Sequence, residues 1–303
     1  MVTKQFLEEV LAIDGLRTQE QYAMAEATTF KIGGPADIFA EASTKDALSA
    51  LVVLCRKKQI PFFLLGAGSN LLVTDSGIDG VVCRLAGDFD QVTVTDTEIV
   101  AGAGVSLAKL ARAAQKAGLT GLEFASGIPG TLGGAVYMNA GAYGGEMKDV
   151  VLETEYMDAN GQVHAVVGEE HKFSYRHSVF CENPDFVILS SRMRLAVKDS
   201  DAIMETMRDL NARRKEKQPL DKPSAGSTFK RPEGYFAAKL IEDAGLKGCS
   251  VGGASVSEKH SGFVVNNGNA TCEDVLGLIK KVQESVKEQF GVSLETEVKI
   301  IGR

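Results

Sequence analysis

The sequence predicts an α+β protein with more than one domain. Its 303 residues are enough to build two or three hydrophobic cores. A strand–helix–strand pattern near the N-terminus is followed by short strands separated by Gly and Asp turns, and helical patterns return in the C-terminal third. This mixture of local patterns, with no internal repeat, is typical of the α+β class.

The composition narrows the range of functions. A hydrophobic fraction of 44% and a charged fraction of 24% are those of a soluble globular protein. The net charge of −7 argues against nucleic acid as the main partner, because phosphate backbones bind basic surfaces. The first twenty residues lack the layout of a signal peptide, and no apolar run is long enough to cross a membrane, so we expect a cytoplasmic protein.

The cysteines and histidines do not indicate a metal site. Five cysteines lie far apart with no CxxC pair, which makes a disulfide framework or a zinc site improbable and fits a reduced cytosol. No pair of histidines has the spacing of metal ligands. We therefore expect no metal.

The N-terminal half is predicted to begin with a polar helical arm over the first thirty residues. A strand at 36–40, a helix at 43–58 and a strand at 61–65 then form a β-α-β unit. Ser43 is the predicted N-cap of this helix, with Asp46 three residues later. Short strands at 81–83, 92–94 and 98–101 precede a helix at 107–116.

The C-terminal half is predicted to contain further strands and three helices. Asn160-Gly161 indicates a hairpin with a type I′ turn, and a strand follows at 186–195. A helix at 201–217 ends in the basic run "ARRKEKQP", which we interpret as a linker. A helix at 235–244, strands near 251 and 263–265, an amphipathic helix capped by Thr271 and a last strand at 297–301 complete the chain.

The stretch "LLGAGSNLLV", residues 64–73, follows an apolar strand and resembles a phosphate-binding loop. It contains Gly66, Ala67, Gly68, Ser69 and Asn70. A P-loop would need GK[ST], and a Rossmann fingerprint would need a third Gly and a following helix, so both fail. Two interpretations stay open, which are a nest of backbone N–H groups around an anion and a tight turn without a ligand.

A second glycine-dense block, "ASGIPGTLGGAVYMNAGAYGG", spans residues 125–145. Glycine costs roughly 0.5–1 kcal/mol relative to alanine in regular structure, so such density needs a reason. Backbone packed against a large flat ligand would supply one. Two loops of this kind favour an extended dinucleotide such as FAD.

Six motifs together resemble a known family. They are "TFKIGGPA" (29–36), "LGAGSNLLV" (65–73), "ASGIPGTLGGAVYMNAGAYG" (125–144), "YRHSVF" (175–180), "AGSTFKRP" (225–232) and "LETEVKIIG" (294–302). Their order and content resemble the UDP-N-acetylenolpyruvoylglucosamine reductase family over nearly the whole chain. The short spacing after Phe180 is similar to the shorter subgroup, which lacks an extra tyrosine-bearing loop.

The resemblance implies a fold and a reaction. The expected architecture is an N-terminal arm at 1–30, a two-subdomain FAD-binding domain of the vanillyl-alcohol-oxidase (PCMH) type at 31–198, split near 74, and a C-terminal α+β substrate domain at 199–303. NADPH would reduce FAD, and flavin N5 would pass the hydride to UDP-N-acetylglucosamine enolpyruvate, giving UDP-N-acetylmuramate for peptidoglycan synthesis. No histidine lies in either glycine loop, so FAD should be non-covalent. The FAD contacts implied are residues 66–70 with Ser126, Gly127, Pro129, Gly130 and Thr131.

The chemistry asks for three kinds of group. Hydride addition to the terminal carbon of an enolpyruvyl ether places negative charge beside a carboxylate, so fixed positive charge and one proton are needed. The resemblance assigns the cation to Arg176, the proton donor to Ser227, and a partner for the substrate carboxylate to Glu297. From residue type alone, a structural ion pair for Arg176, the neighbouring Ser224 or Thr228 in place of Ser227, and Glu295 in place of Glu297 stay open.

The diphosphate of the substrate needs cations. The resemblance implies Lys217, Lys230, Lys247 and His260 as substrate-binding residues, although each also fits a solvated surface position. Arg231 departs from the Asn found after "FK" in some relatives. Rival functions are another FAD-dependent oxidase or dehydrogenase with this fold, and a non-catalytic nucleotide-binding protein.

Overall fold

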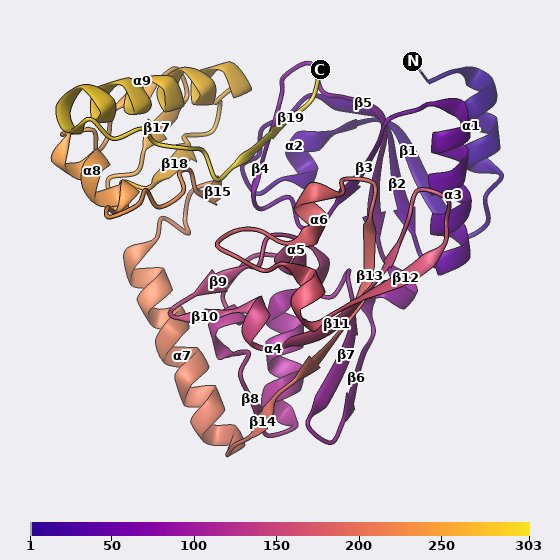
Figure 1. The fold of residues 1–303 in the computed structure, drawn as a ribbon. Helices are drawn as coiled ribbons and strands as arrows, with labels where there is room; N and C mark the ends of the chain where they lie inside the picture. Colours follow the sequence, from indigo (N-terminus) through magenta and orange to yellow (C-terminus); the bar gives the residue numbers. More distant parts are fainter. Residues whose placement is uncertain (1) are drawn as a thin grey trace. The chain divides into compact units, whose positions relative to one another are not determined.

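The computed structural model describes residues 2–303, which form two compact units. Unit 1 contains the residues up to 20 with 38–67 and 80–213, and unit 2 contains 21–37, 68–79 and 214–303. This grouping differs from the division expected at residues 30 and 198. The segments 21–37 and 68–79 pack with the C-terminal residues, and the N-terminal residues pack into unit 1 (Figure 1).

The N-terminal part of the fold is a four-stranded sheet with helices. Its elements are α1 (Lys4–Leu11), β1 (Leu16–Ala23), β2 (Pro35–Ala42), α3 (Lys45–Lys58), β3 (Phe62–Leu65) and β5 (Ile78–Leu85). The strand order is β1-β2-β5-β3, with β3 parallel to β5. The predicted strand–helix–strand unit is confirmed, although β5 lies between its two strands. The predicted helical arm is wrong at residues 16–23, where β1 extends the sheet beside β2, although Met24–Ala27 form the short helix α2.

The N-cap of α3 is Thr44 and not the predicted Ser43. The hydroxyl of Thr44 accepts a hydrogen bond from the Ala47 N–H at 3.2 Å, whereas the Ser43 hydroxyl donates to the Gly15 carbonyl at 2.8 Å. Both residue types can cap a helix, so the tertiary partner of Ser43 decided the choice.

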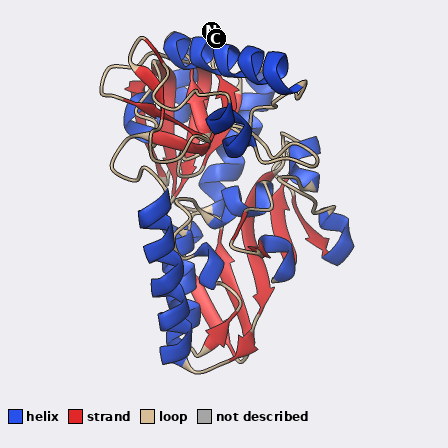
Figure 2. Cartoon of the chain, turned by 90° about the vertical axis from the view of Figure 1, so that its left-hand side faces the viewer, coloured by secondary structure: helices blue, strands red, loops and turns tan. Residues whose placement is uncertain are grey.

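The largest sheet of unit 1 has five antiparallel strands in the order β12-β11-β13-β7-β6. The strands are β6 (Val92–Thr95), β7 (Glu98–Gly102), β11 (Val151–Met157), β12 (Val163–Val167) and β13 (Val187–Arg194). The helices α4 (Leu107–Lys116) and α5 (Leu132–Tyr137) pack against it (Figure 2). The smaller elements of unit 1 are β8 (Leu119–Thr120), η2 (Glu123–Ala125), β9 (Gly141–Ala142), β10 (Gly145–Glu146), η3 (Met147–Asp149), η4 (Gly168–His171), α6 (Val179–Glu182) and β14 (Ala196–Val197), with η1 (Gly87–Asp90) before β6.

The hairpin predicted at Asn160-Gly161 exists, but its turn is not type I′. The last strand pair is Met157 with Val163, so five residues form the loop. Only Gly161 of the two central residues has a positive φ, at +77°. The Asp158 carboxylate accepts hydrogen bonds from the N–H groups of Gln162 and Asn160, which lower the pKa of Asp158 to about 2. These side-chain bonds add to a backbone hydrogen bond from the Gly161 N–H to the Asp158 carbonyl at 2.9 Å, so Asp158 stabilises the turn in two ways.

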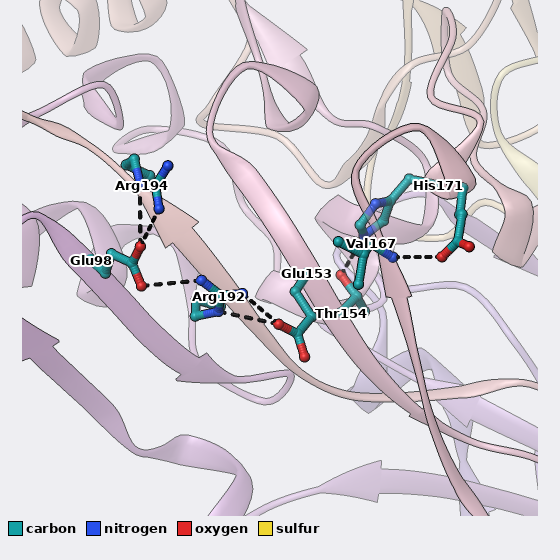
Figure 3. Close-up of polar contacts among 8 residues, drawn as sticks. Glu98, Glu153, Thr154, Val167, His171, Arg192 and Arg194 are labelled. Atoms are coloured by element: carbon teal, nitrogen blue, oxygen red, sulfur yellow. Dashed lines mark hydrogen bonds and ion pairs between the residues drawn. The ribbon is translucent and has the colours of Figure 1, made fainter.

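The solvent-facing side of the five-stranded sheet carries a row of ion pairs (Figure 3). Arg192 Nη2 lies 2.6 Å from Glu153 and its Nη1 lies 3.2 Å from Glu98, which also binds Arg194 at 2.7 Å. The hydrogen bonds from Arg194 and Arg192 lower the pKa of Glu98. Solvent screens charges at such an exposed surface, so these pairs contribute little to stability.

A buried polar row runs from β11 and β13 to η4. His171 is fully buried, and its Nδ1 lies 2.9 Å from the Gly168 carbonyl oxygen. Its Nε2 lies 2.9 Å from the Thr154 hydroxyl, which in turn lies 3.0 Å from Ser191 Oγ. A carbonyl can only accept, so Nδ1 carries the proton and Nε2 accepts from Thr154. Burial is the main cause that lowers the pKa of His171.

Helix α7 (Ser200–Lys217) includes most of the basic run predicted as a linker. The run continues the helix to Lys217, and the boundary between the units falls after Arg213, inside this helix. Charged residues that solvate well in a loop solvate equally well on an exposed helix, so composition did not distinguish the two.

Unit 2 is built on a four-stranded antiparallel sheet in the order β15-β18-β17-β16. Its elements are α2 (Met24–Ala27), β4 (Leu71–Val73), β15 (Ser224–Ser227), α8 (Ala237–Asp243), β16 (Ser250–Val251), β17 (Ala254–Val256), β18 (Phe263–Asn266), α9 (Cys272–Phe290) and β19 (Lys299–Ile301). Strand β19 pairs in parallel with β4, which joins the end of the chain to residues 71–73 (Figure 1).

Helix α9 confirms the predicted amphipathic helix. Thr271 and Asp274 form a reciprocal capping box, and Val275, Ile279 and Val282 lie buried against the sheet. Each such side chain contributes roughly 1.5–3 kcal/mol relative to exposure. The same core takes in Phe30 and Leu72 from the two N-terminal segments. Across the described residues, we find no helix with the length and apolar character needed to span a membrane.

Candidate active site

The first glycine loop, residues 66–70, connects β3 to β4 as predicted, with no helix after it. Gly68 has φ +62°, and a Cβ on it would lie 2.2 Å from the Ala27 carbonyl oxygen. The Thr29 N–H donates to the Gly68 carbonyl at 3.1 Å. Only glycine fits this combination of left-handed backbone and close approach.

The second glycine loop, residues 126–131, lies in unit 1, where Thr131 is close to Gly66 at the start of the first loop. A Cβ added to Gly66 would lie 2.8 Å from Thr131 Oγ1. Thr131 is the N-cap of α5, and its hydroxyl accepts from the Gly134 N–H at 3.4 Å. Ser126 donates its hydroxyl proton to the Glu123 carbonyl at 2.8 Å. Within unit 1, the structure therefore brings Thr131 next to Gly66.

These two loops suit a pyrophosphate. Neither contains an acidic side chain, and both contain backbone N–H groups. The close approach of Gly66 to Thr131 leaves no room for a side chain between them. A ligand with a diphosphate can thus be held by backbone donors without a fixed counter-charge.

The later glycines of the block have a different role. A Cβ on Gly133 would lie 2.9 Å from that of Ala103, one on Gly141 would lie 2.6 Å from Glu146, and one on Gly145 would lie 2.6 Å from the Phe124 ring. These glycines permit tight packing within the protein itself. Glycine density alone did not separate them from loop residues that face a ligand.

Arg176 lies at the tip of a tight hairpin in unit 1. The N–H and C=O groups of Ser174 and His177 bond to each other at 3.1 and 3.2 Å, and Arg176 has φ +56°. Its Nη2 donates to the Gly141 carbonyl at 3.4 Å, and its guanidinium carbon lies 5.3 Å from the centre of the Tyr175 ring. Tyr175 is half-exposed, so the hairpin presents an arginine and an aromatic ring at its tip.

Ser227 and Glu297 come together in unit 2. The Glu297 N–H donates to the Thr228 carbonyl at 2.8 Å, and the Lys230 N–H donates to the Glu295 carbonyl at 2.9 Å. Residues 228–230 and 295–297 therefore run antiparallel. Ser227, the last residue of β15, precedes this contact directly.

Asn70 of the first glycine loop reaches the same place. Its side-chain amide donates to the Glu297 carbonyl at 3.2 Å, and its carbonyl accepts from the Lys299 N–H at 2.9 Å. Within unit 2, the predicted cofactor residue Asn70 is thus joined to the predicted catalytic residue Glu297 by its side chain and to Lys299 by its backbone.

The structure distinguishes the predicted residues from their neighbours. The Thr228 hydroxyl is buried and accepts from the Val264 N–H at 3.0 Å, so it is engaged in the sheet. Glu295 has 76% of its side chain exposed and pairs with Lys230 at 3.1 Å. Ser227 and Glu297 are partly buried. Thr228 and Glu295 are therefore engaged in structural contacts, and the roles of Ser227 and Glu297 stay predictions.

The predicted substrate-binding residues are less uniform. Lys217 is exposed at the end of α7, Lys230 pairs with Glu295, and Lys247 pairs with Glu242 at 2.7 Å. His260 accepts a hydrogen bond from the Gly262 N–H at 3.1 Å, and burial, with the positive charge of Lys247, lowers its pKa. His260 is therefore neutral near pH 7 and can serve an anion as a hydrogen-bond donor, not as a cation.

Thr29 was not singled out from the sequence. Its hydroxyl donates to the Ser224 carbonyl at 2.7 Å, and its N–H donates to Gly68. It links the first glycine loop to the strand that ends at Ser227. Its place in the motif "TFKIGGPA" was the available signal, but nothing in the residue type indicates this role.

The cysteines and acidic residues add no further chemistry. Burial raises the pKa of Cys55 and Cys83 to about 12, so both thiols stay protonated at neutral pH. Within residues 2–303, no group of three or more His, Cys, Asp or Glu side chains is arranged to hold a metal ion.

Comparison with known proteins identifies the two parts of the chain. Residues 36–167 match the FAD binding domain family, and residues 218–301 match the C-terminal domain of UDP-N-acetylenolpyruvoylglucosamine reductase. A berberine bridge enzyme variant shares the fold at 14% identity, with a TM-score of 0.51 over 64% of this chain and 44% of its own. The expected flavin-binding α+β fold with a C-terminal domain is confirmed, and the chain is an FAD-dependent oxidoreductase.

Closer relatives specify the family. UDP-N-acetylenolpyruvoylglucosamine reductase of Caldanaerobacter subterraneus subsp. tengcongensis is 54% identical over 98% of this chain and 97% of its own. The crystal structure of UDP-N-acetylenolpyruvylglucosamine reductase from Thermus caldophilus aligns with a TM-score of 0.81 at 37% identity, covering 94% of this chain and 99% of that one. The chain belongs to the UDP-N-acetylenolpyruvoylglucosamine reductase family, as its motifs indicated.

Proposed function

We propose that this protein reduces UDP-N-acetylglucosamine enolpyruvate to UDP-N-acetylmuramate in the cytoplasm, with NADPH as the electron donor, as a step of peptidoglycan precursor synthesis. Bound FAD supplies the chemistry of accepting a hydride from NADPH and delivering it to the substrate. The two glycine loops, residues 66–70 and 126–131, would hold its diphosphate. The meeting of Asn70, Glu297 and the segment after Ser227 in unit 2 is the observation that carries the proposal.

Arg176 has the role of stabilising negative charge. When the terminal carbon gains a hydride, the neighbouring carbon becomes carbanionic beside a carboxylate. A guanidinium stays charged at all working pH values and can bind a carboxylate with two parallel hydrogen bonds. The left-handed backbone of Arg176 supports a functional role, because such strain persists where the surrounding structure holds it in place.

Ser227 has the role of giving one proton to that neighbouring carbon. A serine hydroxyl is a weak acid, so the alkoxide that remains after the transfer needs a neighbour that stabilises it or relays a proton to it, and Lys230 is the nearest cation in sequence. Glu297 has the role of holding the substrate carboxylate, which it can do as a protonated carboxyl group that donates a hydrogen bond. Lys217, Lys230, Lys247 and His260 would bind the diphosphate and sugar, with Lys230 and Lys247 leaving their present carboxylate partners.

An anaerobic visible spectrum tests this function directly. NADPH should bleach the bound-flavin band of the purified holoprotein, and UDP-N-acetylglucosamine enolpyruvate should restore it. A flavin that bleaches without recovering would retain the flavoenzyme class and reject the substrate. Rapid recovery in air with no response to the sugar nucleotide would favour an oxidase, and binding of flavin without bleaching would favour a non-catalytic protein.

A further inference from the structure

Unusual backbone conformations gather around the hairpin that carries Arg176. Among the described residues, eight that are not glycine have a positive φ, and four of them fall between 139 and 176. They are Asn139 (+45°), Tyr143 (+55°), Lys172 (+50°) and Arg176 (+56°). A positive φ is unfavourable for a residue with a Cβ, so this part of unit 1 is held by contacts that compensate.

Asn139 makes the most complete set of these contacts. It is fully buried directly after α5. Its Nδ2 donates to the Ser174 carbonyl at 3.0 Å and to Glu146 Oε2 at 2.9 Å, and its Oδ1 accepts from the Lys148 N–H at 2.9 Å. The amide thus uses both N–H groups and its oxygen, and all three bonds are partly buried.

The bond to Ser174 connects Asn139 to Arg176. Ser174 and His177 close the hairpin with two backbone bonds, so fixing the Ser174 carbonyl fixes the base of the turn. The Arg176 guanidinium then reaches the Gly141 carbonyl at 3.4 Å, two residues after Asn139. The segment that begins with Asn139 therefore holds the hairpin at its base and contacts the arginine at its tip.

The residue type fits this position closely. Asparagine tolerates a left-handed backbone better than most residues, and it carries a donor and an acceptor on one short side chain. Aspartate has the same shape but no donor, so it would set a carboxylate against the Ser174 carbonyl and the Glu146 carboxylate. Glycine would keep the backbone conformation and remove all three side-chain bonds.

We infer that Asn139 is a positioning residue for Arg176. Its hydrogen bond to the Ser174 carbonyl holds the base of the hairpin that carries Arg176. This inference rests on the proposed function, in which Arg176 binds the carboxylate of the sugar nucleotide. A displacement of about 1 Å from the productive geometry can cost about 100-fold in rate. Asn139 should therefore control the step that uses Arg176 and leave the reduction by NADPH unaffected.

The test is a double-mutant cycle on the holoenzyme, with the two half-reactions measured by stopped-flow absorbance. N139D and N139G should each slow flavin reoxidation by UDP-N-acetylglucosamine enolpyruvate about 100-fold and leave reduction by NADPH within about twofold. In an R176A background the same substitutions should change reoxidation by less than about threefold, because the residue that they position is gone. In calorimetric titration, the Asn139 substitutions should weaken binding of UDP-N-acetylmuramate when Arg176 is present. They should change this affinity little in the R176A background.

N266D is the matched control. Asn266 is also buried, and its side chain donates to the Phe30 carbonyl at 3.1 Å and accepts from the Gly268 N–H, but it lies in unit 2. N266D should lower thermal stability as the Asn139 variants do. Its effect on flavin reoxidation should be the same whether residue 176 is Arg or Ala. Equal slowing of both half-reactions by the Asn139 variants, or the same slowing with and without Arg176, would overturn the inference. Normal reoxidation by R176A itself would instead reject the proposed role of Arg176.

Discussion

Replacing Gly68 by alanine should cost the protein both stability and flavin, and the structure provides the magnitude. Gly68 has φ +62°, where a residue with a Cβ pays about 1–2 kcal/mol. The new Cβ would lie 2.2 Å from the Ala27 carbonyl oxygen. A carbon–oxygen contact needs about 3.3 Å, so one of the two backbone segments must move by about 1 Å. Such overpacking costs about 1–3 kcal/mol, which brings the total to about 2–5 kcal/mol.

Gly245 offers a matched control for this substitution. It also lies in unit 2 with φ +72°, but nothing lies within 4 Å of its would-be Cβ. Gly245→Ala should therefore pay only the backbone cost of about 1–2 kcal/mol. The two variants separate the clash from the conformational preference of glycine.

The assay measures two quantities for each variant. Urea titration gives the loss of stability, and the ratio of flavin to protein absorbance after purification gives the FAD occupancy. Gly68→Ala should lose more stability than Gly245→Ala and should carry less FAD, because Asn70 follows in the same loop. A Gly68→Ala protein with full flavin content and the stability of the Gly245→Ala protein would refute the argument.

Three further predictions concern single side chains. Ser227→Ala should leave flavin reduction by NADPH intact and slow reoxidation by the sugar nucleotide at least about 100-fold in stopped-flow traces, whereas equal loss in both would indicate a structural serine. Glu297→Gln should lower turnover far more than the exposed control Glu295→Gln, and similar kinetics for the two would reject the assignment. His171 has a lowered pKa in the fold, so the unfolded chain binds its proton first as the pH falls below about 6.5. The unfolding free energy should then fall by up to about 1.4 kcal/mol per pH unit until the folded pKa is reached, and His171→Asn should remove this slope in denaturant titrations at several pH values.

Local signals predicted the elements that depend on neighbouring residues. The helix after Thr271 has a capping box and a buried stripe at helical spacing, and both features are confirmed by the structure. The strand before the first glycine loop and the absence of a helix after it followed from the same kind of pattern.

Features that depend on distant partners were not predicted. The segment 16–23 is polar along most of its length and gives no strand signal, yet β1 pairs at the edge of a sheet. Ser43 and Thr44 can both cap a helix. The Ser43 hydroxyl instead donates to the distant Gly15 carbonyl, which leaves Thr44 as the cap. The density of glycine in the sequence also did not distinguish the glycine close to Thr131 from those that pack on Phe124 or Ala103.

In the candidate site, too, local motifs could be recognised in the sequence, whereas contacts with distant residues could not. Family motifs selected Ser227 and Glu297, but their physical reason is visible only in the structure, where Thr228 is committed to the sheet and Glu295 to an exposed ion pair. Asn139 lies inside the second glycine-dense block, and no local pattern predicts its bond to Ser174, which is 35 residues away.

The parallel pairing of β19 with β4 has a consequence for how the protein is made. Residues 71–73 leave the ribosome early, but their partner strand is synthesised more than two hundred residues later. Arg303 adds ion pairs to Asp37 at 2.8 Å and to Asp79 at 3.3 Å, which join the same distant segments. Contacts of such sequence separation form slowly. Unit 2 must therefore wait for residues 297–303, and during translation its early segments are available to chaperones while unit 1 already has most of its chain.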